Sequence, residues 1–206
     1  MISNNEKGRV KDLVEKIQRG ELTSKEAKKR LKEQGLMGQA SWKWTLFGLI
    51  IYALYFILWV PLNIELSAQL QVISFPMAVI YISLILVAIG TFFAIWVTYS
   101  HQKKGGLRGS DETIIFYREG LYSVMRHPGV FGFMIWFICL PIILSLHVPF
   151  TYLTVTGIIL IVISHYYMVH VEEKINVVKW GDEYIQYMKE VPRFNFLLGL
   201  WNLRKK

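Results

Sequence analysis

Arginine and histidine stand side by side in the sequence where an apolar helix is expected to begin. Arg126 and His127 immediately precede Pro128, and a long apolar run follows Pro128. Proline is favoured in the first turn of a helix, where its missing N–H has no partner to lose. The free N–H groups of a helix start and a cationic pair both attract anions. The spacing therefore predicts an anion-binding position at this helix start.

Two adjacent carboxylates, Glu172 and Glu173, follow the next apolar run. We expect them at the end of a helix, where the negative pole of the helix dipole disfavours carboxylates. We interpret this local cost as a sign that they bind a ligand; the alternative is a solvated helix end assisted by Arg126. His165 lies roughly two turns before Glu172 on the same face. An ionisable residue in an apolar helix is a functional candidate, with packing or hydrogen bonding as the alternative role.

Apolar runs long enough to cross a membrane surround these residues. Hydrophobic residues make up 53% of the 206-residue chain, more than is typical of a soluble domain. A hydrocarbon core of about 30 Å takes about 20 helical residues. Runs of this length lie at about residues 43–61, 72–99, 129–147 and 150–171. The second run is longer than needed, and we expect Pro76 to bend its outer end. We predict an all-α fold, a polytopic membrane helical bundle.

The distribution of basic residues predicts the orientation of this bundle. Lys and Arg number 11 in residues 1–43, 5 in residues 101–126 and 7 in residues 174–206. The connections around 62–71 and 146–150 contain none. With four spans, the basic segments share one side, which the positive-inside rule identifies as the cytoplasm. We therefore expect a multi-pass protein with cytoplasmic N- and C-termini. Topology and contact with anionic membrane lipids explain the net charge of +8 without nucleic acid as a partner.

The topology brings the charged motifs together. A short turn near residues 146–149 returns the chain as the fourth span, so the start of the third span lies beside the end of the fourth. Arg126 and His127 should therefore reach Glu172 and Glu173 at the cytoplasmic edge of the bilayer.

Residues 1–38 are expected to form a cytoplasmic helical hairpin appendage, and residues 39–206 the membrane domain. Residues 4–34 have helical patterning, and Thr23 with Glu26 fits a capping box. The glycine-containing loop 100–119 is either a lid over a site or a plain connector. Cys139, the only cysteine, excludes an internal disulfide, and no Cys/His spacing indicates a metal site.

Together, the two motifs resemble the isoprenylcysteine carboxyl methyltransferases and their phospholipid methyltransferase relatives, which are integral membrane enzymes. The family pattern is roughly G-x-Y-x-x-x-R-H-P-x-Y-x-G, then E-E-x-x-L-x-x-x-F-G-x-E-Y-x-x-Y and V-P-R. The resemblance covers about residues 114–196. The matching residues are Gly120, Tyr122, Arg126, His127, Pro128, Gly132, Glu172, Glu173, Trp180 (for the aromatic), Gly181, Glu183, Tyr184, Tyr187, Val191, Pro192 and Arg193. Val130 replaces a family tyrosine, and Asn176 replaces a leucine.

This resemblance implies S-adenosylmethionine as methyl donor and S-adenosylhomocysteine as product. The donor's α-carboxylate would suit His127 and Arg126. Glu172 or Glu173 would accept hydrogen bonds from its ribose hydroxyls or amino group, and Tyr122 or Tyr184 would face the sulfonium. The residues assigned to cofactor binding are Tyr122, His127, Pro128, Gly132, His165, Glu172, Glu173 and Tyr184.

The resemblance leaves the methyl acceptor open within a lipophilic or prenylated class. A carboxylate acceptor is already a nucleophile and needs only a cation, Arg193 or Arg126. An amine acceptor would need a carboxylate to take its proton, and Glu173 is the candidate. The catalytic residues assigned are Arg126, Glu173 and Arg193. Carboxyl O-methylation of a prenylcysteine-type substrate is the first expectation, and N-methylation of a phospholipid or other amine is the second.

Other functional classes fit parts of the same sequence. Membrane sterol reductases, which use NADPH, resemble the C-terminal architecture, although the Arg-His-Pro motif and the glutamate pair favour the methyltransferase. A non-catalytic membrane adaptor would act through the N-terminal hairpin instead of the charged motifs.

Overall fold

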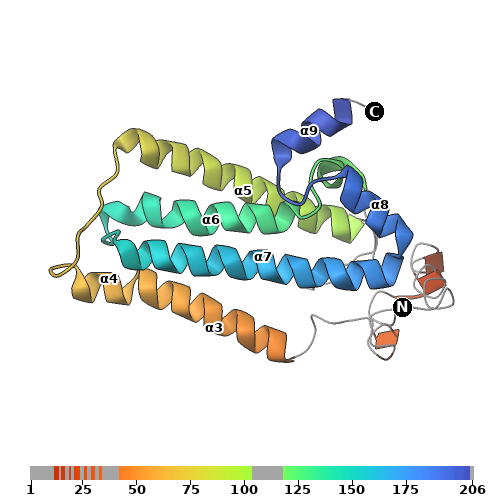
Figure 1. Cartoon of the computed structure of the whole chain (residues 1–206), viewed down its shortest axis with the longest axis horizontal. Helices are drawn as coiled ribbons and strands as arrows, with labels where there is room; N and C mark the ends of the chain where they lie inside the picture. Colours follow the sequence, from red (N-terminus) through yellow and green to blue (C-terminus); the bar gives the residue numbers. More distant parts are fainter. Residues whose placement is uncertain are drawn as a thin grey trace. The chain divides into compact units, whose positions relative to one another are not determined.

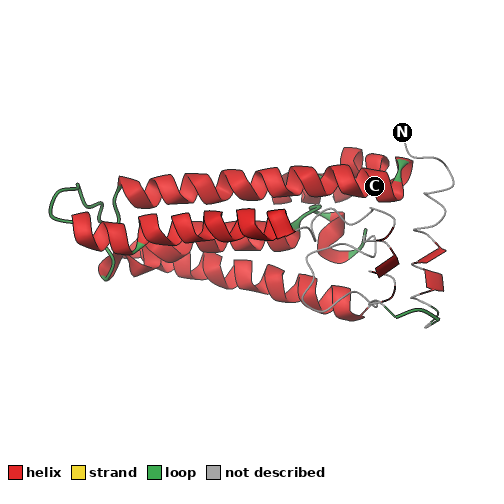
Figure 2. Cartoon of the chain, turned by 90° about the horizontal axis from the view of Figure 1, so that it is seen from below, coloured by secondary structure: helices red, strands yellow, loops and turns green. Residues whose placement is uncertain are grey.

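All regular elements in the described part of the chain are helices. The computed structural model describes residues 42–103 and 118–204 and, nearer the N-terminus, residues 12, 13, 15, 16, 19, 21–23, 26, 29, 30 and 33. The elements are α3 (Trp42–Trp59), α4 (Pro61–Leu66), α5 (Met77–Lys103), η1 (Gly120–Ser123), α6 (Pro128–Ile143), η2 (Leu144–Leu146), α7 (Tyr152–Trp180), α8 (Asp182–Glu190) and α9 (Phe196–Arg204) (Figures 1 and 2).

Four stretches are long and apolar enough to cross a membrane, which confirms the predicted polytopic helical bundle. They are Leu46–Leu66, Met77–Ser100, Pro128–Leu146 and Tyr152–Trp180. Large apolar side chains such as Ile85, Ile95 and Ile163 lie mostly exposed on these helices. A hydrocarbon surrounding accepts such side chains, whereas water would not.

The predicted beginning of the second span is wrong. Helix α5 begins at Met77, and residues 71–76 have no regular structure. Pro76 does not bend the helix but precedes it, and its carbonyl accepts the first hydrogen bonds, from Val79 and Ile80. The residue before a proline is disfavoured in the helical region, so the helix cannot extend back through Phe75.

The position of the glutamate pair relative to its helix also differs from the expectation. Helix α7 continues past residue 171 to Trp180 and stops at Gly181, whose φ of 59° favours glycine. Glu172 and Glu173 therefore lie inside the helix, and the argument from the negative pole of its dipole is wrong. Their meaning depends on what surrounds them.

The chain separates into two compact units. Unit 1 comprises Met1–Ser41, Trp96–Pro128 and Val169–Lys206, and unit 2 comprises Trp42–Ile95 and Gly129–Met168. All Lys and Arg residues except Lys43 belong to unit 1, and the only Asp or Glu in unit 2 is Glu65. The division by contacts therefore places the three basic segments of the sequence in the same unit.

Close backbone contact and an aromatic core hold the helices of unit 2 together. A Cβ on Gly132 of α6 would lie 2.5 Å from the carbonyl oxygen of Gly90 of α5, so the glycines permit this approach. Tyr55, Trp59 and Ile161 form the core between α3 and α7. Pro141 has no N–H to offer the carbonyl of Phe137. The Tyr55 hydroxyl donates to that carbonyl instead, over 2.9 Å.

An amide–hydroxyl cluster lies at the α4 end of unit 2. The amide nitrogen of Asn63 donates to the Thr154 hydroxyl at 2.8 Å and to the carbonyls of Leu58 and Trp59 at 2.6 and 2.9 Å. The Thr151 hydroxyl donates to the amide oxygen of Asn63. Asn63, Thr151 and Thr154 are fully buried. This neutral cluster fixes α4 to the start of α7.

In unit 1, α8 packs through one apolar face. Tyr184, Tyr187 and Val191 form a buried cluster with the end of α7. The Tyr187 hydroxyl donates to the carbonyl of Tyr122 in η1 over 2.7 Å. This bond fixes the segment before Arg126 to α8.

The capping box predicted near the N-terminus is present. The Glu26 carboxylate accepts from the Thr23 N–H at 3.1 Å, and the Thr23 hydroxyl accepts from the Glu26 N–H at 3.3 Å. Most residues of the predicted hairpin and of the 100–119 loop, including Gly35 and Gly105-Gly106, lie outside the described residues. The lid and the domain boundary at residue 38 therefore stay predictions.

Candidate functional site

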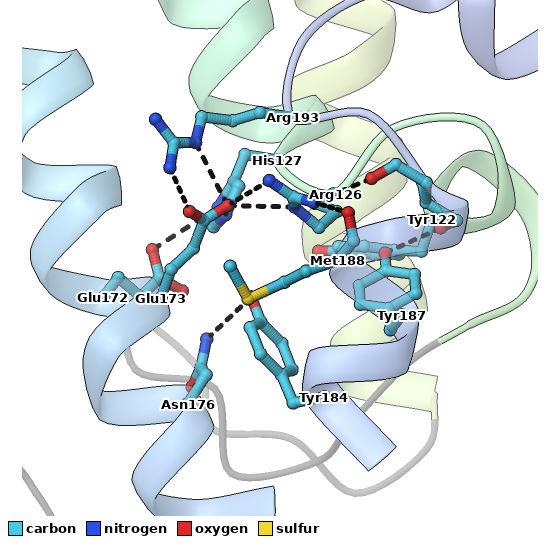
Figure 3. Close-up of polar contacts among 11 residues, drawn as sticks. Tyr122, Arg126, His127, Glu172, Glu173, Asn176, Tyr184, Tyr187, Met188 and Arg193 are labelled. Atoms are coloured by element: carbon cyan, nitrogen blue, oxygen red, sulfur yellow. Dashed lines mark hydrogen bonds and ion pairs between the residues drawn. The ribbon is translucent and has the colours of Figure 1, made fainter. Parts of the chain in front are cut away.

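The buried carboxylate of Glu173 is the centre of an ion cluster in unit 1 (Figure 3). Its Oε1 accepts from Nε of Arg126 at 2.9 Å, Nε2 of His127 at 3.2 Å and Nε of Arg193 at 3.1 Å. Its Oε2 accepts from Nη2 of Arg193. Arg126 and His127 thus lie within reach of the glutamates, as the hairpin topology predicted. Because two guanidinium groups and an imidazole surround Glu173, its charge is compensated although it is buried.

Arg126 holds several segments of this site together. Its Nη1 donates to the carbonyls of Met188 and Val191 at 2.6 and 2.9 Å, and its Nη2 lies 2.9 Å from Glu173 Oε1. Nε, Nη1 and Nη2 therefore all have protein partners. The guanidinium joins α7, α8 and the residue that follows α8.

Backbone bonds join the two charged motifs as well. The N–H of Arg126 donates to the carbonyl of Pro192 at 3.0 Å, and that of His127 to the carbonyl of Arg193 at 3.4 Å. These N–H groups serve the Val-Pro-Arg segment, although they lie just before the helix start that was expected to attract an anion. These two N–H groups are therefore not available to an anion.

Glu172 and Arg193 are the more accessible members of the ion cluster. The side chain of Glu172 is 16% exposed and that of Glu173 is 2% exposed. Arg193 is 18% exposed, against 8% for Arg126. Nδ1 of His127 lies 3.6 Å from Glu172 Oε2. The histidine therefore stands between an inner carboxylate and an outer one.

An aromatic wall adjoins the charges. Tyr184 and Tyr187 pack edge to face, with ring centroids 5.7 Å apart. The buried amide of Asn176 donates to the Tyr184 hydroxyl at 3.4 Å, so the residue that departs from the family pattern contacts this wall. Burial raises the pKa of both tyrosines, so both remain protonated and neutral at physiological pH. The wall places two buried, neutral tyrosines beside the ion cluster.

The remaining predicted residues are placed differently. Pro128 is fully buried at the first position of α6, as predicted, and the carbonyl of Tyr122 accepts from Tyr187. Gly132 and His165 belong to unit 2. His165 lies 3.2 Å from the Tyr52 hydroxyl and 2.7 Å from the Ile161 carbonyl, which matches its alternative hydrogen-bonding role. Their assignment to cofactor binding stays a prediction.

The sequence analysis assigned no site role to several residues that build this site. Met188 and Val191 contribute backbone carbonyls to Arg126, and carbonyls leave no mark on side-chain patterns. Arg118 pairs with Glu190 at 3.1 Å and lies over the Tyr187 ring, 5.7 Å from its centroid. The sequence signal for the contact between Arg118 and the Tyr187 ring was the spacing of Tyr184 and Tyr187, which places both rings on one face of α8.

Comparison with known proteins adds no relative: no family model matches the chain, and no match was found among curated proteins or solved structures.

Proposed function

We propose that the protein is an integral membrane methyltransferase that uses S-adenosylmethionine to methylate a lipid-like acceptor. The observation that carries this proposal is the convergence of Arg126, His127, Glu172, Glu173 and Arg193 in one ion cluster. The same residues carry the resemblance to the membrane methyltransferases. They belong to two motifs that are far apart in the sequence.

The groups around the ion cluster fit the chemistry of the donor. S-adenosylmethionine carries a carboxylate, an ammonium, ribose hydroxyls and a sulfonium. His127 supplies a hydrogen-bond donor for the carboxylate. Glu172 supplies an acceptor for the ammonium or the hydroxyls, and the ring of Tyr184 suits the sulfonium.

We propose different roles for the two glutamates. Glu173 is held by two arginines and a histidine and organises them, whereas the more exposed Glu172 is our candidate for contact with a ligand. Arg126 is committed to Glu173 and to two backbone carbonyls, so we assign it a positioning role. Arg193 also pairs with Glu173 but is more exposed, so we assign it as the cation for a bound anion.

A carboxylate acceptor agrees best with this division. When bound, the donor supplies a methyl group: the acceptor oxygen forms the new C–O bond, the C–S bond breaks, and its electron pair stays on sulfur. A carboxylate becomes an ester without releasing a proton, so no base is needed, and Arg193 orients it. An amine would need a base, and the oxygens of Glu173 are already occupied by cations. Carboxyl O-methylation of a prenylcysteine-type substrate is therefore the preferred reaction.

We assign unit 1, which holds nearly all the basic residues, to the cytoplasmic side. The donor would then reach the ion cluster from water, and the acceptor from the bilayer.

The experiment is calorimetry of S-adenosylhomocysteine binding to the purified protein, followed by assays with radiolabelled donor and a panel of farnesylcysteine and lipid amine acceptors. We expect binding to the unmodified chain and methylation of farnesylcysteine. His127→Ala should weaken binding at least about tenfold, or about 1.4 kcal/mol. His170→Ala, at an exposed histidine of α7, is the matched control. Binding of NADPH in place of S-adenosylhomocysteine would indicate a reductase, and binding of neither would contradict the proposal.

A further inference from the structure

Two short helices of unit 1 present opposite kinds of surface. Both α8 and α9 are nine residues long. The exposed side of α8 carries mainly polar residues: Asp182, Glu183, Gln186 and Lys189. The exposed side of α9 carries Leu197, Leu198, Leu200, Trp201 and Leu203. A water-facing helix has the pattern of α8, and α9 does not.

Helix α9 is attached to unit 1 by a defined edge. A Cβ on Gly199 would lie 1.8 Å from the carbonyl oxygen of Val124, so the helix backbone lies directly on that carbonyl. The Asn202 amide donates to the Glu190 carbonyl at 3.1 Å. The side chain of Asn195 caps the helix by accepting from the Leu198 N–H at 3.0 Å. This packing uses the side of Gly199 and Asn202 and leaves the leucines and the tryptophan outside.

The outward side combines apolar bulk with positive charge. Leu197 is 77% exposed and Trp201 is 57% exposed. Arg204 lies in the last turn of α9, and Lys205 and Lys206 follow it in the sequence. Leucine and tryptophan insert at the boundary between headgroups and acyl chains, while clustered cations attract anionic headgroups. A protein with four membrane-length helices has such a surface beside it.

We infer that α9 lies in the membrane interface, with Leu197 and Trp201 inserted and Arg204 on anionic headgroups. This lipid contact goes beyond methyl transfer and does not depend on it. Since α9 packs on Val124 and Glu190, the contact also fixes how unit 1 meets the bilayer.

The test places a nitroxide label at position 197 in the full chain. Cys139→Ala removes the native thiol, Leu197→Cys provides the site, and Gln186→Cys on α8 is the control. The protein is reconstituted in nanodiscs of phosphatidylcholine with or without phosphatidylglycerol. We expect the ratio of oxygen to nickel-chelate accessibility to be several-fold higher at 197 than at 186, and higher still with phosphatidylglycerol.

Three outcomes would overturn the inference. A label at 197 that is as accessible to the nickel chelate as that at 186 lies in water. One shielded from both reagents is covered by protein, and one broadened by a second label is covered by another copy of the chain.

Discussion

Two buried polar clusters in this protein differ in how completely they are closed. In unit 2, the side chain of Asn63 is fully buried, and both its nitrogen and its oxygen have protein partners. In unit 1, the cluster around Glu173 is charged, and its outer members Glu172 and Arg193 are partly exposed. A closed neutral cluster stabilises helix packing, whereas a charged cluster with accessible members retains the capacity to bind a ligand. The exposure of a buried polar cluster, as well as its presence, therefore helps to distinguish a structural role from a binding role.

The largest effect is expected where the charge balance of unit 1 is broken. Glu173→Gln leaves Arg126 buried without its counter-charge and should lower the free energy of unfolding by about 3–5 kcal/mol. Denaturant titration in detergent would measure it. Because Arg126 and Glu173 interact directly, the loss in the double variant with Arg126→Gln should be smaller than the sum of the single losses. Additive losses would mean that the ion pair is not coupled.

A smaller loss is expected from opening the closed cluster. Asn63→Ala removes the partners of Thr151 and of two backbone carbonyls, and should cost about 2–3 kcal/mol of unfolding free energy. The same titration measures it, with Thr154→Val as a milder change. S-adenosylhomocysteine affinity of the folded protein should not change. A loss of affinity equal to that of a unit 1 variant would remove the distinction between the clusters.

Glu172→Gln should show the opposite pattern. Since Glu172 is the more exposed carboxylate, we expect S-adenosylhomocysteine to bind at least about tenfold more weakly, or about 1.4 kcal/mol. Its unfolding free energy should change by less than about 0.5 kcal/mol. Calorimetry and denaturation on the same preparation test both points, with Glu65→Gln as the control. A variant that unfolds readily but binds normally would assign Glu172 to stability.

The smallest effect concerns Thr23 and Glu26, an exposed pair whose hydrogen bonds form in contact with water. The Thr23 hydroxyl and N–H lower the pKa of the Glu26 carboxyl below its ordinary value. This pairing therefore stabilises the helix start above the unfolded pKa, and the contribution is lost as pH falls through the folded pKa. Thr23→Ala should raise the pKa of Glu26 towards its ordinary value. Carboxyl NMR would measure it, and an unchanged pKa would contradict the capping bond.

Simple sequence signals predicted the fold. The two wrong helix boundaries arose because local backbone preferences were not considered. Apolar length predicted four membrane helices, and Pro128 marked the start of α6 correctly. The early start assigned to the second span ignored the restriction that Pro76 places on Phe75. The end of α7 was predicted too early because the end of the apolar run was taken as the end of the helix. The helix continues through polar residues to Trp180.

The sequence could predict which residues meet in the candidate site but not the position and role of each one. A helical hairpin brings the ends of consecutive spans together, so the meeting of Arg126 and His127 with the glutamates could be predicted. Which glutamate would be enclosed could not, since both follow the same run. The Asn63 cluster was also missed: Asn63 and Thr154 are distant in sequence, and neither has a conspicuous pattern.

By itself, the sequence determined the all-helical class, the membrane-length helices and the segments that carry charge, because these depend on local propensity and on the solvent that each run prefers. Only the tertiary structure decided that Glu173 is enclosed while Glu172 remains accessible, that Arg126 binds carbonyls of the α8 segment, and that α9 turns its leucines outward. These outcomes depend on which side chain occupies a given position among several helices. That choice is made by packing and charge pairing across the chain, which no local pattern contains.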